Sequence, residues 1–147
     1  KEIVRRALSE FRFAHSQHKI TLENKLSNNE DRIIADFDKI LQMIVNLLDN
    51  AAKFSPAATE IVIGIKASPS NIYLTIKDQG RGISKKDMSG VFEKFSRGGN
   101  STVEGMGLGL FLVRNITLQH HGDIKIRSKE NKGTQIQIKL PRIKNYG

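Results

Sequence analysis

Polar side chains form one narrow stripe along the otherwise apolar segment LQMIVNLLDNAAKFSP, residues 41–56. At about 100° per residue, a helix places five of them within roughly a third of its circumference: Gln42, Asn46, Asp49, Asn50 and Lys53. Amide and carboxylate oxygens suit a hard cation such as Mg²⁺, and a lysine ammonium suits phosphate. Because unsatisfied polar groups on a buried helix cost free energy, the stripe indicates a site for a nucleotide with a magnesium ion. A surface helix whose polar face meets water would give the same pattern.

An evenly spaced glycine run follows downstream, at residues 105–110 (GMGLGL). Its spacing is not the G-x-G-x-x-G of dinucleotide-binding folds, and the chain contains no G-x-x-x-x-G-K-[ST] phosphate loop. Glycines still let a backbone approach an anion closely. A helix that begins near Leu108 would also offer free N–H groups and the positive end of its dipole. The run therefore predicts a phosphate site, with a flexible loop before an ordinary helix as the alternative.

A carboxylate followed by two glycines comes directly after a predicted strand, in Asp78-Gln-Gly80-Arg-Gly82-Ile83. An aspartate in that position can accept a hydrogen bond from the exocyclic amine of a base, and the glycines let the ring come close to the backbone. The segment predicts a base-recognition site, although a polar turn would have a similar composition.

Two phenylalanines and an arginine follow, in the segment VFEKFSRGG, residues 91–99. Phe92 and Phe95 would anchor a short helix, while Arg97 lies beside two glycines. The residues from Arg97 to Gly105 have almost no apolar side chain to bury. That composition predicts a lid whose order depends on a ligand.

In this order and spacing, the four segments resemble the ATP-binding boxes of the sensor histidine kinases, within the GHKL superfamily of Bergerat-fold ATPases. The boxes correspond to residues 46–56, 78–83, 92–98 and 105–110. The end of the chain is also similar to the family: His121-Gly122-Asp-Ile, then Gly133-Thr134 leading into Leu140-Pro141. The resemblance spans nearly the whole chain, and four boxes in order are more specific than any one of them.

The resemblance implies roles for the helix that carries the polar stripe. Asn50 would supply its side-chain oxygen to Mg²⁺, and Asn46 would make a second or water-mediated contact with the metal. Lys53 would pair with the terminal phosphates of ATP, and Phe54 would pack against the adenine.

The resemblance also implies a base pocket and a phosphate cradle. Asp78 would accept from the adenine amino group, with Thr134 behind the base. The residues that shape the base pocket would be Gly80, Gly82 and Ile83. The residues that hold the phosphates at the helix start would be Gly105, Gly107, Leu108, Gly109 and Leu110.

The third box would contribute from the lid. Arg97 would approach the γ-phosphate, and Phe95 belongs to the same box. The resemblance therefore implies that Asn46, Lys53 and Arg97 carry the phosphoryl transfer, mainly by positioning and charge neutralisation.

One departure concerns the position one helical turn before Asn50. The hydrolytic relatives (gyrase-type, mismatch-repair and heat-shock chaperone ATPases) carry a glutamate there as the general base for water, whereas this chain has Asn46. An amide cannot accept a proton at neutral pH. The site is expected to hold ATP without activating water efficiently, which leaves the γ-phosphoryl group for another nucleophile.

That nucleophile in the family is a histidine within a His-Glu-Leu/Ile-Arg-type segment of a separate dimerising hairpin. The four histidines of this chain, His15, His18, His120 and His121, lie in no such segment. The last two come at a helix end, where the negative end of the dipole explains them. We expect residues 1–147 to be a single catalytic and ATP-binding domain, without the hairpin and the sensor region. It would phosphorylate the hairpin of its own parent protein, for onward relay to a response regulator.

Periodicity predicts three main helices: residues 2–17, the polar-stripe helix capped by Asp36 or Asp38 and ended before Pro56, and residues 108–121 stopped by Gly122. A short helical piece is predicted near residues 85–92. Strands are predicted at residues 20–26, 31–35, 60–67, 71–77, 124–127 and 134–140, with turns at Ser68-Pro69-Ser70 and Asn131-Lys132-Gly133. This pattern favours a two-layer α/β (α+β) sandwich of helices on a mixed, mostly antiparallel sheet, the Bergerat-type fold.

Composition bounds the class of protein. With 147 residues, 38% of them hydrophobic and 27% charged, the chain is typical of one soluble globular domain. It contains no cysteine, which excludes disulfides and thiolate metal sites, and no run of residues is long and apolar enough to span a bilayer. We expect a cytoplasmic domain that does not insert into a membrane, is monomeric in isolation, and could belong to a membrane-anchored sensor.

The net charge of +9 favours anionic partners without naming them. Two rival functions remain open. One is a stand-alone GHKL protein-serine kinase of the anti-sigma-factor type, although those relatives tend to carry an acidic residue at the position of Asn46. The other is a basic nucleic-acid-binding module, but the chain has no Trp and only two Tyr for base stacking, and its charge is dispersed. The expected ligands are therefore ATP and Mg²⁺, with no nucleic acid.

Overall fold

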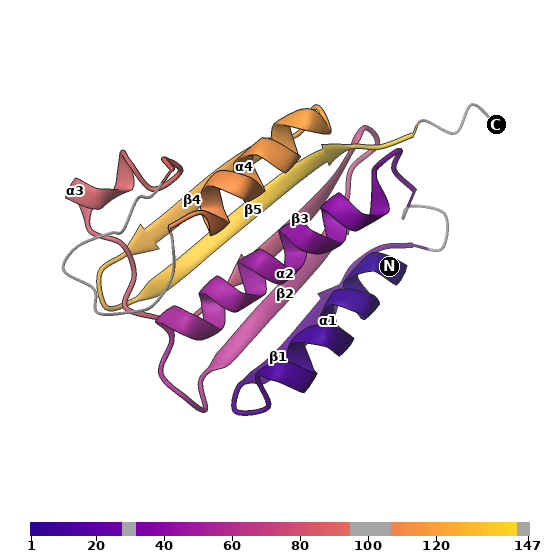
Figure 1. Ribbon diagram of the computed structural model, residues 1–147. Coiled ribbons are helices and arrows are strands. Elements are labelled where there is room, and N and C mark those ends of the chain that lie inside the picture. Colours follow the sequence, from indigo (N-terminus) through magenta and orange to yellow (C-terminus); the bar gives the residue numbers. More distant parts are fainter. Residues whose placement is uncertain (28–31, 95–106, 144–147) are drawn as a thin grey trace.

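Residues 1–27, 32–94 and 107–143 are described by a computed structural model of the chain. A five-stranded sheet forms one layer, and the three main helices cover one of its faces (Figure 1). In chain order the elements are α1 (Glu2–Ala14), β1 (Lys19–Asn24), α2 (Phe37–Phe54), β2 (Glu60–Ala67), β3 (Asn71–Lys77), α3 (Lys85–Met88), α4 (Gly109–Gln119), β4 (Asp123–Lys129) and β5 (Gly133–Pro141). The predicted two-layer α/β sandwich is confirmed.

The sheet is mixed, with strand order β1-β2-β3-β5-β4. β1 and β2 are parallel and pair Lys19 with Glu60, whereas the other three pairings are antiparallel. Parallel neighbours need a crossover connection, and α2 supplies it between β1 and β2. The hairpin predicted around residues 68–70 joins β2 to β3 and pairs Ala67 with Ile72.

The core lies between α2 and the central strands. Alternate residues of β2, β3 and β5 are buried: Ile61, Ile63, Ile65, Ile72, Leu74, Ile76, Ile136, Ile138 and Leu140. α2 lies between α1 and α4 and buries Met43, Ile44, Leu47 and Leu48 almost completely (Figure 1). Full burial of one such side chain contributes about 1.5–3 kcal/mol, so α2 is the rigid centre of the helical layer.

The two ends of α2 agree with the sequence signals. Asp36 is the N-cap, and its side chain accepts a hydrogen bond from the N–H of Lys39 over 3.1 Å. This selects Asp36 over Asp38 as the capping residue. The helix ends at Phe54, and Ser55 is already extended before Pro56. The polar stripe therefore lies on one continuous helix, with Asp36 as its N-cap and Ser55 as its C-cap.

The end of α4 differs from the prediction. The helix stops at Gln119, and His121, rather than Gly122, takes the left-handed conformation with φ 55°. Gly122 is needed for a different reason, because a Cβ there would lie 2.4 Å from the Lys139 carbonyl oxygen.

His120 forms hydrogen bonds through both ring nitrogens: Nδ1 is 2.8 Å from the Ile116 carbonyl, and Nε2 accepts from the Asp36 N–H over 3.0 Å. The ring hydrogen is therefore on Nδ1, and specific hydrogen bonds rather than the helix dipole explain this histidine.

The strand predicted at residues 31–35 is wrong for the part that the structure describes. Residues 32–36 form no strand, and residue 31 lies outside the described ranges. Ile33 and Ala35 pack against the core while Ile34 is 85% exposed, so a connecting segment imitates strand alternation. The predicted N-terminal helix also ends earlier, at Ala14, and the short helix covers only Lys85–Met88.

Candidate functional site

The first glycine segment is held against the carboxyl-terminal end of α2. The backbone N–H of Arg81 donates to the Phe54 carbonyl over 3.1 Å. Gly80 is buried there, and a Cβ on it would lie 2.5 Å from the same carbonyl oxygen. Gly82 has φ +69°, and a Cβ on it would lie 2.0 Å from the Lys129 carbonyl oxygen. Close backbone approach therefore requires both glycines, and it joins this segment to α2 and to the β4–β5 turn.

Gly109 of the second glycine segment lies against Asn50, in the carboxyl-terminal half of α2. A Cβ on Gly109, at the start of α4, would lie 3.1 Å from Nδ2 of Asn50 and 3.4 Å from its Oδ1. Asn50 is half-buried, and its amide has no hydrogen bond to any residue in the described ranges. The fold therefore brings this glycine and this asparagine together and leaves the amide available to a ligand.

Asp78 lies just beyond the end of β3, and its carboxylate is fixed by backbone groups. Oδ1 accepts from the N–H of Gly80 over 2.8 Å and from the N–H of Thr134 over 3.1 Å. Oδ2 has no partner within the described part of the chain. Burial raises the pKa of the Asp78 carboxyl above its ordinary value, although the hydrogen bonds from Gly80 and Thr134 oppose the shift. One carboxylate oxygen thus holds the loop, and the other can accept from a ligand.

Ser128 connects the base-recognition segment to β5. Its Oγ accepts from the N–H of Ile83 over 2.8 Å, and it lies 2.8 Å from Oγ1 of Thr134 and 3.0 Å from the Gly133 carbonyl. Sequence reasoning missed this residue, because one serine in a strand of alternating charged and apolar residues carries no motif. The signal that could have found it is its pairing with Thr134 in the β4–β5 hairpin.

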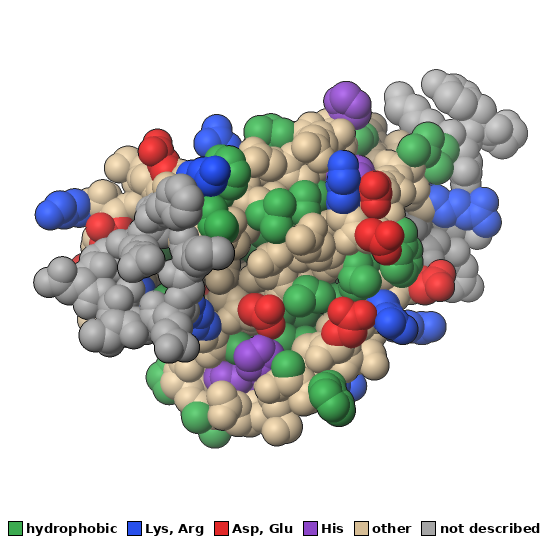
Figure 2. All heavy atoms as spheres, in the orientation of Figure 1, with side chains coloured by type: hydrophobic (Ala, Val, Ile, Leu, Met, Phe, Trp, Pro, Cys, Tyr) green, Lys and Arg blue, Asp and Glu red, His purple; other side chains and the backbone are tan. Residues whose placement is uncertain are grey.

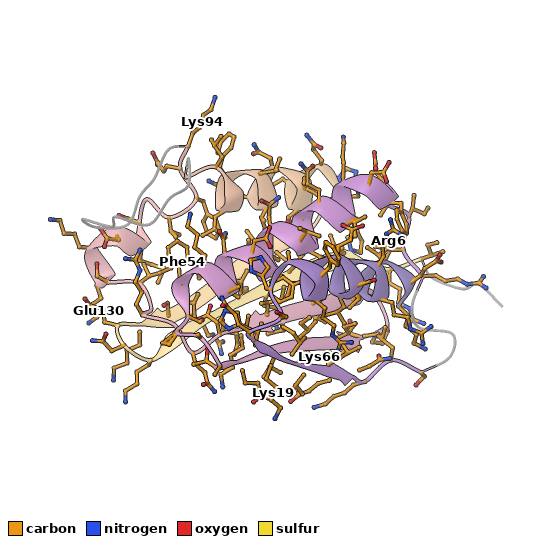
Figure 3. All side chains as sticks on the ribbon, turned by 60° about the horizontal axis from the view of Figure 1, so that its bottom comes forward. Arg6, Lys19, Phe54, Lys66, Lys94 and Glu130 are labelled. Atoms are coloured by element: carbon orange, nitrogen blue, oxygen red, sulfur yellow. The ribbon has the colours of Figure 1, made fainter. Side chains whose placement is uncertain are left out.

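Cations surround the Phe54 ring. Lys53 Nζ lies 5.6 Å from its centroid, and Arg81 Cζ lies 4.8 Å from it. Arg81 was not predicted as a site residue, yet its side chain covers the aromatic ring assigned to the adenine. Figure 3 shows Phe54 at the end of α2, in the half of the molecule that also holds the β4–β5 turn with Glu130. The packing of Phe54 against a base stays a prediction.

The polar stripe divides into two parts in the structure. Nδ2 of Asn46 donates to the Gln42 carbonyl over 2.9 Å, which leaves Oδ1 of Asn46 as its available group. Asp49 instead lies 3.0 Å from Nε2 of His15, which extends from the end of α1. The inference that a nucleotide satisfies the whole stripe is therefore wrong for Asp49, because a histidine of the same chain satisfies it.

The start of α4 is open. Gly107 has φ +65°, Leu108 is the N-cap, and no side chain among the described residues caps the helix. The first N–H groups of α4, at Gly109 and Leu110, therefore have no side-chain partner there, as a phosphate cradle requires. Phe95, Arg97 and Gly105, with the whole predicted lid from 97 to 104, lie outside the described residues.

Residues 35–144 match the family described as histidine kinase-, DNA gyrase B- and HSP90-like ATPases. The chain belongs to this family. The curated relatives it matches include the sensor protein RprX of Bacteroides fragilis, 32% identical across 98% of this chain and 29% of RprX. They also include the sensor histidine kinase WalK of Bacillus subtilis, 34% identical across 91% of this chain and 23% of WalK. The chain thus spans less than a third of the length of these two relatives.

Solved structures have a fold similar to that of this chain. The mycobacterial sensor histidine kinase MprB superimposes with a TM-score of 0.86 and 30% identity, covering 96% of this chain and 94% of that one. Full-length ShkA in complex with AMPPNP superimposes with a TM-score of 0.83 at 19% identity, which supports the fold alone; the match covers 99% of this chain and 30% of ShkA. The family domain is therefore of the sensor histidine kinase type, within the GHKL superfamily.

Among the residues that the structure describes, no group of three or more His, Cys, Asp or Glu side chains is placed to hold a metal ion. None of the helices in the same ranges has the length and apolar character needed to cross a membrane.

Proposed function

We propose that the chain binds Mg²⁺–ATP and presents the γ-phosphoryl group to a histidine on a dimerisation hairpin of its parent protein. It would then act as the catalytic domain of a protein-histidine kinase. The family and its sensor-kinase relatives support ATP as the nucleotide. The observation that carries the proposal is the carboxylate of Asp78, held through Oδ1 by two backbone N–H groups with Oδ2 left to accept from a base.

Base recognition would rest on the loop that follows β3. Oδ2 of Asp78 accepts from the adenine amino group, and Thr134 lies behind the base. Gly80 and Gly82 pack against the backbone of Phe54 and Lys129, because neither position tolerates a Cβ, and this would fix the loop beside the base. Ile83 is held by its bond to Ser128, so it forms a fixed wall of the pocket. Guanine carries a carbonyl where adenine carries the amine, so the same carboxylate selects ATP over GTP.

A magnesium ion fits the groups present on α2. Asn50 offers an amide oxygen that is half-buried and has no partner within the described ranges, and Asn46 offers Oδ1 one turn earlier. Amide oxygens suit Mg²⁺, which usually keeps several waters and takes its remaining ligands from substrate phosphates. The shortage of clustered carboxylates in the described residues agrees with such a shared site. When bound, the ion neutralises charge on the phosphates.

Phosphate binding and transfer would use the two neighbouring elements. The first N–H groups of α4 have no side-chain cap among the described residues and would bind the phosphates, and Lys53 would supply a positive charge. Arg97 would add a second charge from the third box. Asn46 cannot remove a proton from water, so the γ-phosphoryl group waits for the histidine of the hairpin.

The whole protein's organisation extends the proposal. Residues 1–147 would form a single catalytic domain that meets a histidine-bearing hairpin of the same parent, and the phosphate would pass on to a response regulator. The domain would work in the cytoplasm, as a monomer when isolated, and would need no nucleic acid. No observation in the described structure favours the serine-kinase or nucleic-acid alternatives.

The decisive experiment supplies the hairpin in trans. The chain is incubated with Mg²⁺–ATP and a dimerisation hairpin from the parent or from a WalK-type relative, and acid-labile phosphate is measured on each component. We expect phosphohistidine on the hairpin, none on the chain, and slow ATP hydrolysis without the hairpin. Stable phosphate on His15, His18, His120 or His121 would contradict the proposal.

A further inference from the structure

The face of the sheet that the helices leave uncovered carries an open cavity of about 280 Å³. It lies where β3, β5 and β4 run side by side. The strand register places Lys77 of β3 and Arg127 of β4 on either side of Gln135 of β5. These residues alternate with Ile76 and Ile136, which are buried beneath the helices, so their side chains leave the sheet on the opposite face.

The walls of this cavity are strongly cationic. Its four basic lining residues are Lys77, Arg127, Lys129 and Lys132. None of them forms an ion pair with any residue in the described ranges. Asp78 also lines the cavity, but the N–H groups of Gly80 and Thr134 hold its carboxylate. Glu130 of the same turn is not a lining residue.

Three other positive charges on this face have partners. Lys19 lies 3.4 Å from Glu60 at the β1 edge, and Lys139 lies 3.8 Å from Asp123. Lys66 lies over an aromatic ring, 5.5 Å from its centroid. Figure 3 shows Lys19 extending from the side of the sheet away from the helices. Lys125 of β4, next to Arg127 on this face, has no ion pair in the described ranges, so the positive charge without an ion-pair partner lies along β4 and around the cavity.

We propose that this cavity is an anion site, distinct from the nucleotide site, for a compact ligand with clustered phosphate groups. Four neighbouring cations outnumber the one carboxylate that lines the cavity, so they repel one another, and an anion that bridges them reduces that repulsion. Lysine and arginine offer only donors, and a glutamine amide adds two more, which matches the acceptor oxygens of phosphate. The cavity volume of about 280 Å³ lies at the small end of the roughly 300–1,000 Å³ of pockets for drug-sized ligands, which suits a compact anion.

The two sites lie back to back. The cavity is lined by Asp78, Gly133 and Thr134, and the first and last of these are the residues assigned to the base on the helix side. Strand alternation directs Lys77, Arg127 and Lys129 to the open face, whereas Oδ1 of Asp78 is held by the N–H groups of Gly80 and Thr134. Occupancy of the two sites is therefore separable by location, and this inference does not depend on the proposed function.

Amide NMR of the ¹⁵N-labelled chain tests the site, with inorganic tripolyphosphate added in magnesium-free buffer. We expect shifts centred on Lys77, Arg127 and Gln135. The variant Arg127→Gln/Lys129→Gln should weaken this binding by about three- to tenfold, since an exposed charge pair contributes roughly 0.2–1 kcal/mol. The matched control Lys19→Gln/Lys66→Gln removes the same charge from the same face and should leave the affinity within twofold of the unaltered chain.

A second arm separates two sources of the same chemistry, a free polyphosphate and a phosphorylated lipid headgroup. Vesicles of phosphatidylcholine with and without phosphatidic acid are sedimented with each variant. Binding of tripolyphosphate alone assigns a soluble ligand, and binding to the phosphatidic acid vesicles that Arg127→Gln/Lys129→Gln abolishes assigns a headgroup. Equal losses of tripolyphosphate affinity in the two double variants, or amide NMR shifts confined to α2 and α4, would overturn the proposal.

Discussion

The Oδ1 atom of Asp78 accepts a hydrogen bond from the backbone N–H of Thr134 over 3.1 Å, and the Asp78 N–H donates to the Thr134 carbonyl over 2.9 Å. This reciprocal pair joins the end of β3 to β5 and fixes the carboxylate without using Oδ2. Burial nevertheless raises the pKa of that carboxyl. A buried charge that the fold disfavours, beside an available acceptor, is typical of a functional residue.

Asp78→Asn should separate stability from recognition. The amide oxygen can keep both backbone hydrogen bonds, and the charge that burial disfavours is gone, so the unfolding free energy should be unchanged or slightly higher. The outward atom becomes a donor and no longer accepts from the adenine amine. A charge-assisted bond contributes ~1.5–3 kcal/mol, so ATP affinity should fall about tenfold or more, and the preference for ATP over GTP should shrink. Calorimetric titration with both nucleotides measures this, and unchanged discrimination would place the base elsewhere.

The pH dependence of nucleotide affinity follows from the same group. Because the folded-state pKa of Asp78 is raised, the carboxyl is protonated at a higher pH than an ordinary aspartate, and affinity should fall as pH decreases through that value. The pH dependence of folding stability has the opposite sign. Stability contributed by this group is lost as pH rises from the unfolded-state pKa through the folded-state pKa. The ratio of affinities of the unaltered chain and Asp78→Asn cancels the titration of the nucleotide, and a ratio independent of pH would contradict the assignment.

Much of this fold was predictable because its signals are local. The 18-residue α2 carries a cap, a continuous apolar face and a proline just beyond its end, and the bounds predicted for β2 and β3 match the structure. The failures came from tertiary context. The strand predicted at residues 31–35 alternates in hydrophobicity, but its described part pairs with no strand in the described ranges, and His121 rather than Gly122 adopts the left-handed conformation.

From the sequence, only those residues of the candidate site that belong to a recognisable motif could be predicted. The glycine boxes gave Gly80, Gly82 and Gly109, and the structure adds the backbone contacts that require the first two and the Asn50 contact of the third. Ser128 acts through bonds to residues 45 and 6 positions away along the chain, which no local pattern encodes. Arg81 covers the Phe54 ring for the same kind of reason, since their contact forms only when the loop after β3 folds against α2.

Alanine at two glycines should give opposite outcomes. At Gly80 a Cβ would lie 2.5 Å from the Phe54 carbonyl oxygen, so Gly80→Ala must move backbone and should lower the unfolding free energy. At Gly109, the first residue of α4, the nearest atom is Nδ2 of Asn50, 3.1 Å away at the end of a side chain, and alanine lowers the conformational entropy of the unfolded chain. Gly109→Ala should therefore fold at least as well but bind Mg²⁺–ATP more weakly. Thermal unfolding and nucleotide titration measure both, and normal ATP affinity in Gly109→Ala would argue against a role for Asn50.

Ser128→Ala tests whether that hydroxyl positions the base pocket. The change leaves the N–H of Ile83 and the hydroxyl of Thr134 without their partner, so stability should fall by ~1 kcal/mol. A purely structural role would lower stability and leave the ATP-to-GTP affinity ratio unchanged. If Ser128 positions Ile83 and Thr134, the ATP-to-GTP affinity ratio should also decrease, and Ser128→Thr, which keeps the hydroxyl, should restore it. An unchanged ratio in folded Ser128→Ala would leave the residue a purely structural role.

Asn50 and Asp49 are neighbours on α2 and provide a matched test of the magnesium assignment. Asp49 is satisfied by Nε2 of His15 at 3.0 Å, whereas Asn50 has no partner in the described residues. Asn50→Ala removes a metal-facing oxygen, so the gain in ATP affinity on adding Mg²⁺ should disappear while affinity in excess EDTA changes little. Asp49→Asn should keep the magnesium-dependent gain, because its carboxylate faces α1 rather than the ligand. Titrations of both variants with and without Mg²⁺ give the comparison, and a lost gain in Asp49→Asn with a preserved one in Asn50→Ala would reverse the assignment.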